Sequence, residues 1–178
     1  AFHMDEYVGL PADAPQRFGN FLRVHLFDRV NPGHVEYLDG MAADVEQECA
    51  RYAGLLLERG IDIVCAGIGE NGHMAFNDPH VADFDDPQVV KVVTLDEVCR
   101  TQQVHDGAFP TVDDVPKQAL TMTMSALTSA ERITCVVPGS TKTDAVYRTL
   151  HNPVSEICPA TAMRRHEHAI LYLDAEAA

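Results

Sequence analysis

The chain has 178 residues and 46% of them are hydrophobic, which favours one domain with a single sizeable core. Its formal net charge of −14 repels nucleic acid and anionic lipid, so we expect neither a nucleic acid nor a membrane as a partner. No apolar run reaches the ~18–20 residues of a membrane span, and no signal-peptide pattern opens the chain. We therefore expect a cytoplasmic protein.

Short apolar runs alternate with longer amphipathic segments, which is the βαβ pattern of α/β proteins. In chain order, the pattern predicts helices at 15–30 and 44–59, strands at 61–66 and 89–95, a short helix at 96–103, a loop at 106–116, a strand at 133–137, a helix at 141–150 and a strand at 169–173. Met122 and Met124 alternate with threonines and indicate a further strand against the core. The β-branched run at 61–66 is typical of a strand covered on both faces. We predict an α/β fold with a mostly parallel sheet.

Two adjacent acidic residues, Asp5 and Glu6, stand where a strand-like start meets a turn that contains Gly9 and Pro11. Functional groups collect at strand ends in α/β folds, so the Asp5 carboxyl could project into a crevice there. The alternative is that both acids only solvate a loop or cap a turn. The residues alone leave both interpretations open.

A glycine-rich turn at 67–79 follows a predicted strand and surrounds one polar histidine. Gly69 and Gly72 permit positive φ and a close approach of backbone N–H groups to a ligand oxygen. The unperturbed pKa of histidine, ~6.5, suits His73 to both proton donation and proton acceptance. Asp78 could hydrogen-bond this ring and stabilise its protonated form. The alternative is a core histidine that binds a backbone carbonyl.

Lys142 lies in a predicted strand-to-helix turn at 138–142. A lysine in the first helical turn opposes the helix dipole, so an anionic ligand there would explain it. The alternative is a solvated surface lysine. The histidines show no HExxH or similar spacing and the five cysteines form no CxxC pair, so we expect no metal site.

Two long motifs stand in the chain, Met-Asp-Glu-Tyr-Val-Gly-Leu-Pro at 4–11 and Gly-Ile-Gly-Glu-Asn-Gly-His-Met-Ala-Phe-Asn-Asp-Pro at 67–79. In this order and separation they resemble the glucosamine-6-phosphate deaminase family, whose superfamily also includes 6-phosphogluconolactonases. The segments 106–107, 115–121 and 139–142 support the resemblance, which covers nearly the whole chain. It implies a Rossmann-like three-layer sandwich, and it implies that an N-terminal strand–helix unit and a C-terminal segment of the family are absent here.

The resemblance implies that residues 1–178 form one domain that converts glucosamine 6-phosphate to fructose 6-phosphate and ammonia without a cofactor. His73 would open the sugar ring with an acidic partner, and Asp5 would then move a proton between C2 and C1. A small-molecule sugar phosphate is the expected partner, and a homo-oligomer is left open. The implied catalytic residues are Asp5, His73, Asn71 and Asp78, and the implied substrate-binding residues are Gly69, Gly72, Gln103 and the phosphate-binding Lys142.

Three positions depart from the family's pattern. Asp78 stands where the family usually has Glu, and its shorter side chain could fail to reach His73 in the same geometry. Gln103 stands where many members have an arginine that grips the phosphate, and an amide is a weaker anion ligand than a guanidinium. Asn71 occupies a position that is Asp in some members, which removes one charge beside the histidine.

Other functions stay open beside the deaminase. A related sugar-phosphate lactonase uses a similar Gly-x-Gly-x-x-Gly-His turn to hydrolyse an ester, but residues 4–7 and 75–79 favour the deaminase. A non-catalytic sugar-phosphate sensor could have kept the fold and lost turnover, and Asp78 and Gln103 motivate that interpretation. A further alternative is an enzyme for a different amino sugar phosphate.

Overall fold

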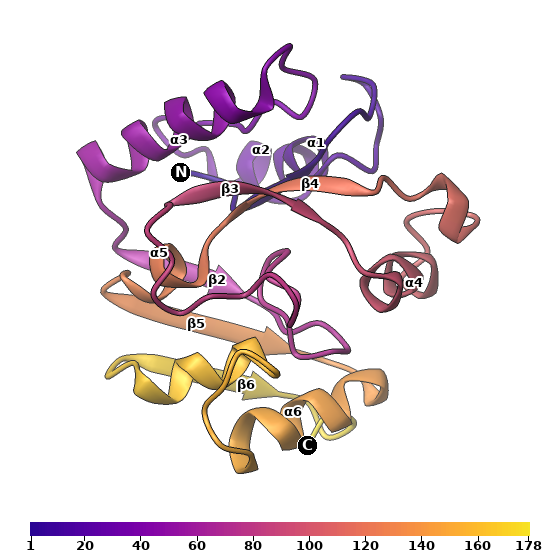
Figure 1. Cartoon of the computed structure of the whole chain (residues 1–178), viewed down its shortest axis with the longest axis vertical. Coiled ribbons are helices and arrows are strands. Elements are labelled where there is room, and N and C mark those ends of the chain that lie inside the picture. The colour runs from indigo at the N-terminus through magenta and orange to yellow at the C-terminus, as the bar shows by residue number, and fades with distance from the viewer.

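The computed structural model describes all 178 residues and contains two three-stranded β-sheets. In the first sheet, β1 (Asp5–Tyr7), β4 (Gln118–Met122) and β3 (Val90–Thr94) lie in that order and pair antiparallel. In the second sheet, β2 (Ile63–Ala66), β5 (Arg132–Val137) and β6 (Ala169–Leu173) lie in that order and pair parallel. Figure 1 shows β3 and β4 above the layer of β2, β5 and β6.

Helical segments connect the strands. The α-helices are α1 (Phe18–Leu22), α2 (Asp28–Val30), α3 (Val45–Arg59), α4 (Glu97–His105), α5 (Met124–Thr128) and α6 (Thr143–His151). A π-helical turn at Arg23–Phe27 joins α1 to α2, and 3₁₀ turns span Val112–Asp114, Ser140–Lys142 and Pro159–Arg165. None of the helices has the length and apolar character needed to span a membrane.

The boundaries of α3 follow from its capping residues. The Asp44 carboxylate accepts hydrogen bonds from the backbone N–H groups of Glu46 and Gln47, at 3.1 and 3.0 Å, and so satisfies donors that have no partner within the helix. Gly60 ends the helix with φ of +72°, a conformation that glycine adopts without steric cost. The helix predicted at 44–59 is therefore confirmed.

The predicted α/β class is confirmed, but the prediction of a mostly parallel sheet is wrong for β1, β3 and β4, which form an antiparallel sheet. The apolar pattern of a strand does not specify the direction of its partner, which depends on how the intervening chain returns. Met122 ends β4 as expected, whereas Met124 begins α5. The reason is Thr123, whose Oγ1 accepts a hydrogen bond from Ala126 N at 3.3 Å and caps that helix.

The main core joins the two sheets. It contains 22 buried residues, among them Val90 and Leu120 of the antiparallel sheet and Val64 and Ile133 of the parallel sheet. A second cluster of eight buried residues packs β1 and the turn after β2 against α4. In that cluster, the Tyr7 ring lies 5.3 Å from the Phe76 ring and 5.4 Å from the Phe109 ring, between centroids. The aromatic contacts therefore hold β1 beside the glycine-rich turn.

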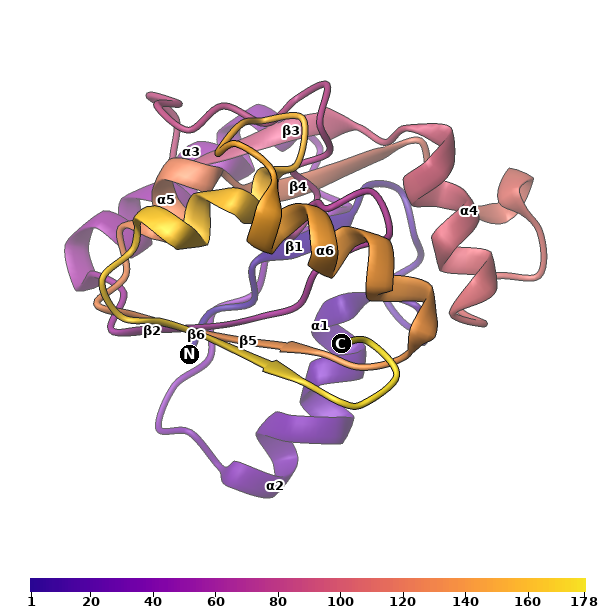
Figure 2. The same ribbon diagram turned by 90° about the horizontal axis from the view of Figure 1, so that it is seen from below.

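The parallel sheet is covered on one face and largely exposed on the other. Figure 2 shows α6 on one side of β2, β5 and β6, and α1 and α2 on the opposite side. On the exposed face, the side chains of Ile63, Val136, Ile170 and Tyr172 are each more than half accessible to solvent. The expectation that β2 is covered on both faces is therefore wrong for this chain, in which only alternate residues of the strand contact the core.

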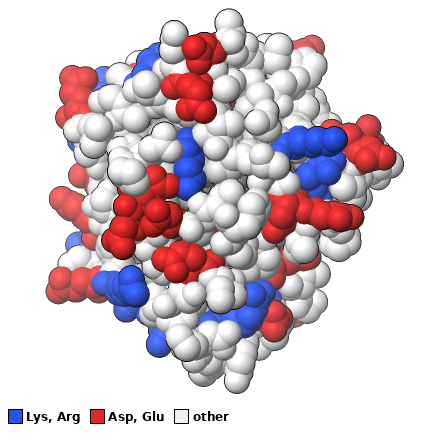
Figure 3. Space-filling model, viewed as in Figure 1, with Lys and Arg blue, Asp and Glu red and all other residues white.

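Charge is spread over the surface in small groups. On the face seen in Figure 3, acidic side chains are scattered across the molecule, with smaller groups of basic side chains between them. This distribution agrees with the formal net charge of −14. The expected absence of a nucleic-acid partner stays a prediction.

A buried carboxylate, Glu6, ties α1 to β1. Its side chain is 1% exposed and accepts hydrogen bonds from the backbone N–H groups of Tyr7, Phe18 and Gly19, at 2.9, 3.2 and 3.1 Å. The Nε atom of Arg17 lies 3.5 Å from the same carboxylate. Because Phe18 and Gly19 begin α1, the carboxylate satisfies donors at the helix N-terminus and fixes α1 against the strand that carries Asp5.

We predict that Glu6→Gln lowers the free energy of unfolding by about 2 kcal/mol, because it removes charge-assisted hydrogen bonds and places an amide donor among backbone donors. Urea unfolding followed by circular dichroism measures the change. Glu58→Gln, at an exposed position of α3, serves as the matched control and should leave stability within about 0.5 kcal/mol. Equal stability of the two variants would contradict this role of Glu6.

Candidate active site

Asp5 is the first residue of β1 and lines a large cavity. The cavity has a volume of about 1170 Å³, and Phe18, Gln103 and Asp106 are among the residues that line it with Asp5. Burial, together with the neighbouring Glu6 charge, raises the pKa of the Asp5 carboxyl to about 7. A carboxyl group with this pKa is present in both protonation states near neutral pH, which suits it to accept and return a proton.

Two glycines shape the turn that carries His73. A Cβ atom at Gly69 would overlap the imidazole ring of His73, so only glycine leaves room for that ring. At Gly72, φ is +90° and a Cβ atom would lie 2.6 Å from Cys158 Sγ. The N–H groups of Gly69 and Gly72 donate within the turn, to His73 O and Gly69 O, both at 2.9 Å. Both glycines are therefore required by packing, and their expected contact with substrate stays a prediction.

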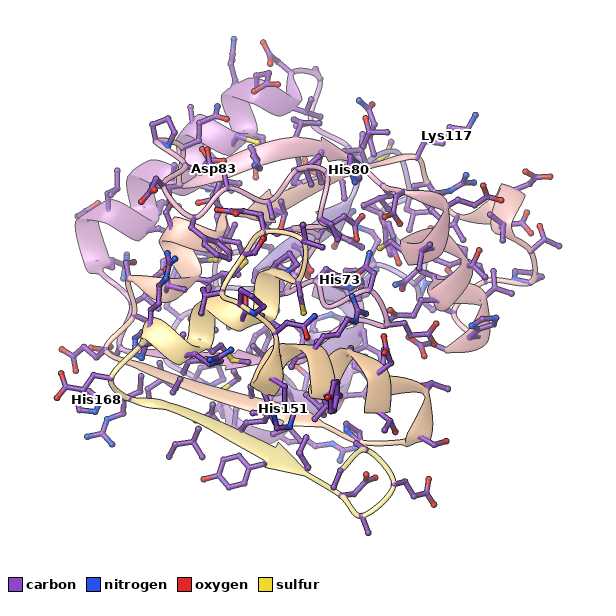
Figure 4. The ribbon with its side chains drawn as sticks, turned by 60° about the horizontal axis from the view of Figure 1, so that its bottom comes forward. His73, His80, Asp83, Lys117, His151 and His168 are labelled. Atoms are coloured by element: carbon purple, nitrogen blue, oxygen red, sulfur yellow. The ribbon has the colours of Figure 1, made fainter.

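His73 and Asp78 form a buried pair within this turn. His73 Nδ1 lies 3.1 Å from Asp78 Oδ1, and the side chains are 9% and 0% exposed. Asn71 Nδ2 donates to the same oxygen at 2.9 Å, and Asn71 Oδ1 accepts from His73 N at 3.0 Å. The shorter Asp78 side chain therefore does reach the histidine. Figure 4 shows His73 in its loop, apart from the exposed His151 and His168.

The protonation state of Asp78 follows from its surroundings. Burial by itself raises the pKa of this carboxyl, but the contacts with His73, Asn71 and the backbone N–H of Asp96 together outweigh burial and hold the pKa below its usual range. Asp78 is thus an anion at neutral pH, whereas Asp5 titrates near pH 7. Two carboxyl groups whose environments shift their pKa values in opposite directions are typical of acid–base sites.

Strand β4 brings the two motifs together. Asp5 is paired with Thr121 in the antiparallel register, and Thr121 Oγ1 accepts a hydrogen bond from Phe76 N at 3.1 Å. Burial raises the pKa of the Cys99 thiol on α4, and the Asp78, Asp96 and Asp5 carboxylates raise it further. The structure therefore places the Asp5 and His73 segments against the same strand.

Gln103 lines the same cavity as Asp5 and is 8% exposed. The hydroxyl of Tyr7 donates to Gln103 Oε1 at 2.7 Å. An arginine at this position could not accept that hydrogen bond, since a guanidinium has no acceptor atom. Glutamine at this position, in place of the family's arginine, therefore provides the acceptor for the hydroxyl of the buried Tyr7.

Lys142 ends the 3₁₀ turn Ser140–Lys142, and α6 begins one residue later than the lysine, rather than including it as predicted. In the same turn, Gly139 has φ of +91° and its N–H donates to the Asp174 carboxylate, at 3.0 and 3.2 Å from the two oxygens. The lysine side chain makes no ion pair in the structure. Nothing in the contacts joins it to His73 or Asp5, so its phosphate-binding role stays a prediction.

Two residues that hold the turn were not identified by the sequence analysis. Arg148 of α6 donates to Glu70 O and Asn71 O, at 3.0 and 3.3 Å. Gln102 of α4 accepts from Glu70 N at 2.8 Å. Both are ordinary polar residues of amphipathic helices. Each lies 32 or more positions along the chain from the turn residue that it contacts, so no local sequence signal could have identified it.

Comparison with known proteins finds similar sequences. Glucosamine-6-phosphate deaminases of Bacillus thuringiensis (strain Al Hakam) and Bacillus anthracis (strain A0248) are each 38% identical to this chain over 175 residues. The aligned part covers 98% of this chain and 65% of each relative, so the chain spans slightly less than two thirds of their length.

Solved structures share the fold. A monomeric glucosamine-6-phosphate deaminase superposes with a TM-score of 0.91 at 36% identity, over 99% of this chain and 72% of the other. A 6-phosphogluconolactonase from Thermotoga maritima superposes with a TM-score of 0.73 at 21% identity, over 97% of this chain and 71% of the other, which shows a common fold only.

The family model of glucosamine-6-phosphate isomerases and 6-phosphogluconolactonases matches residues 1–172. This match covers most of the chain and shows that the chain belongs to the family of glucosamine-6-phosphate isomerases and 6-phosphogluconolactonases.

Proposed function

We propose that the protein is an amino-sugar-phosphate deaminase that converts glucosamine 6-phosphate to fructose 6-phosphate and ammonia. The observation that carries the proposal is the pair of oppositely shifted carboxyl groups, Asp5 and Asp78, with His73 in contact with the second. The relatives at 38% identity that bear this name support it. The fold alone does not separate the deaminase from the lactonase.

In the first step, His73 opens the sugar ring. It transfers a proton between the anomeric hydroxyl and the ring oxygen, which yields the open-chain aldehyde. Asp78 supports this step, since an anion 3.1 Å from Nδ1 stabilises the protonated imidazole. Asn71 fixes the turn through its contacts with both residues.

In the second step, the Asp5 carboxylate removes the proton from C2 and leaves an enol-type intermediate. The protonated Asp5 then returns a proton to C1, so the aldose becomes a ketose-type imine at C2. Addition of water to that imine and expulsion of the amine give fructose 6-phosphate and ammonia. Each positioned acid or base contributes on the order of 10²–10⁴ in rate.

The proposal also includes the contacts to the sugar phosphate and the arrangement of the layers. Gln103 and Lys142 would contact the sugar phosphate, and Gln103 is supported by its place in the cavity beside Asp5. A three-layer, Rossmann-like arrangement is supported by the parallel order β2-β5-β6 with α6 on one face. The cytoplasmic location and the oligomeric state stay predictions.

The direct test is ammonia release from glucosamine 6-phosphate, with galactosamine 6-phosphate and 6-phosphogluconolactone assayed in parallel. We expect ammonia from the first compound together with fructose 6-phosphate. Hydrolysis of the lactone without ammonia release would establish the lactonase instead. Binding of the amino sugar phosphate without any product would indicate the sensor.

The pH dependence of catalysis should report Asp5. Because its pKa is raised to about 7, the base form is lost as the pH falls through that value, so kcat/KM should fall tenfold per pH unit on the acid side. Glu6→Gln should move this midpoint to lower pH, since the Glu6 charge is the second cause of the shift after burial. A profile that stays flat from pH 5 to 8 would rule out a base with this pKa.

Asp5→Asn should reduce kcat by at least about 10³-fold while substrate still binds, because the amide cannot carry the C1–C2 proton. The same substitution should stabilise the protein at pH 8. In the native state the raised pKa disfavours the charged form, so Asp5 lowers stability as the pH rises from the ordinary carboxyl pKa through about 7. Steady-state kinetics and thermal melts at pH 5 and pH 8 measure both effects, and unchanged turnover would refute the role.

His73→Gln should slow the reaction of the closed-ring substrate more than that of an open-chain analogue, because ring opening is needed only for the former. The ratio of the two kcat/KM values, wild type against variant, measures the difference. Asp106→Asn, which alters a cavity residue outside the proposed catalytic set, is the matched control. Equal losses on both substrates would count against ring opening by His73.

A further inference from the structure

Three buried donor atoms of different chemistry lie together in the fold. A ring nitrogen of His73, an Asp78 carboxylate oxygen and Cys99 Sγ are all within 4.8 Å of one another. The three residues are 7%, 0% and 0% exposed, respectively. The turn at 67–79 supplies the first two, and the first helical turn of α4 supplies the cysteine.

A buried ring nitrogen of His73 has no hydrogen-bond partner, which is the second observation. His73 Nδ1 lies 3.1 Å from Asp78 Oδ1, but it forms no hydrogen bond with that oxygen or with any other group. An ion about 2.0–2.1 Å from both His73 Nδ1 and Asp78 Oδ1, the usual zinc distance, would lie roughly 40° off the line that joins these two atoms. In the tautomer that carries its proton on Nε2, the unpaired Nδ1 atom is therefore available to a metal ion shared with Asp78.

The oxygen atoms of Asp78 retain capacity for a ligand. Oδ1 accepts from Asn71 Nδ2 at 2.9 Å and Oδ2 accepts from Asp96 N at 3.3 Å. Each carboxylate oxygen has two lone pairs, so these bonds leave acceptor sites unused. They also orient the carboxylate, as hydrogen-bonded partners do for metal ligands in general.

We propose that His73, Asp78 and Cys99 form a binding site for a borderline transition-metal ion, with Zn²⁺ as the natural occupant and Co²⁺ as its spectroscopic substitute. A nitrogen, an oxygen and a sulfur donor fit these ions, whereas Mg²⁺ and Ca²⁺ require oxygen ligands. On binding, the bond between metal and Cys99 Sγ forms as the S–H bond breaks, and the proton leaves to solvent. A water molecule completes the tetrahedral set.

The neighbouring group of Asp78, His80 and Asp96 is a poorer site. The His80 side chain is 46% exposed, its Nε2 already contacts Thr94 O at 2.9 Å, and its Nδ1 lies 3.9 Å from Asp96 Oδ2. It contains no sulfur donor. The first site could not be recognised from the sequence, because Cys99 stands 26 positions beyond His73, outside any ligand spacing used to recognise zinc sites.

The site has a consequence for regulation that rests on the proposed deaminase function. A bound ion occupies His73 Nδ1 and Asp78, so the imidazole can no longer be supported as a proton carrier in ring opening. Zn²⁺ should therefore inhibit turnover of the closed-ring substrate in proportion to site occupancy.

The test is a Co²⁺ titration of the reduced protein, followed by the near-ultraviolet charge-transfer band of a cobalt–thiolate bond, with displacement by Zn²⁺. We expect one equivalent to produce the band in wild type, and Cys99→Ser to abolish it and to weaken binding at least tenfold. Cys65→Ser, which removes an exposed cysteine, is the matched control and should retain the band. A band that survives Cys99→Ser, or no band in wild type, would overturn the proposal.

A measurement on the unmodified protein covers the case in which Cys99→Ser fails to fold. X-ray absorption of the zinc-loaded wild type should show one sulfur ligand at about 2.3 Å and nitrogen or oxygen ligands at about 2.0–2.1 Å. A coordination shell without sulfur would overturn the site. Neither readout needs turnover, so a metal site without deaminase activity would refute only the proposed function, and activity without the cobalt–thiolate band would refute only the metal site.

Discussion

The site depends on one buried anion, the Asp78 carboxylate. It is completely excluded from solvent, and a charge in that position is tolerated only because His73, Asn71 and the backbone of Asp96 surround it. The same contacts set the position of the imidazole and connect the turn after β2 with the start of α4. The glycines of the turn follow from this requirement, since the ring of His73 occupies the space that a side chain at position 69 would need. The chemistry proposed for the protein is therefore a consequence of how the fold stabilises a single charge.

Much of the fold could be predicted from the sequence where local patterns determine structure. Helix α3 has its capping aspartate and its terminal glycine, and β5 and β6 lie where apolar runs predicted them. The turn around His73 was also recognisable, because three glycines and a histidine follow directly on an apolar run. Its partner Asp78 is five residues away, so the pairing lay within reach of sequence reasoning.

The rest depends on contacts between distant segments. No strand pattern states that β1 and β3 run opposite to β4, and no motif shows that Arg148 and Gln102 hold the backbone of Glu70. The raised pKa of Asp5 comes from burial, which exists only once the chain is folded. Cys99 had no signal either, because a single cysteine in a helix pattern is typical of a core residue. In each case, hydrophobic periodicity indicates which residues are buried, but it does not indicate which of them contact one another.

A carbon-13 NMR titration of the side-chain carboxyl groups tests the opposite pKa shifts of Asp5 and Asp78 most directly, with Asp5→Asn and Asp78→Asn used to assign the two resonances. We expect Asp5 to titrate with a midpoint of about 7, and Asp78 to stay ionised below the ordinary aspartate range. Ordinary midpoints for both carboxyl groups would contradict this expectation, since Asp5 would then not exchange a proton near neutral pH and the fold would not stabilise Asp78 as the anion beside His73.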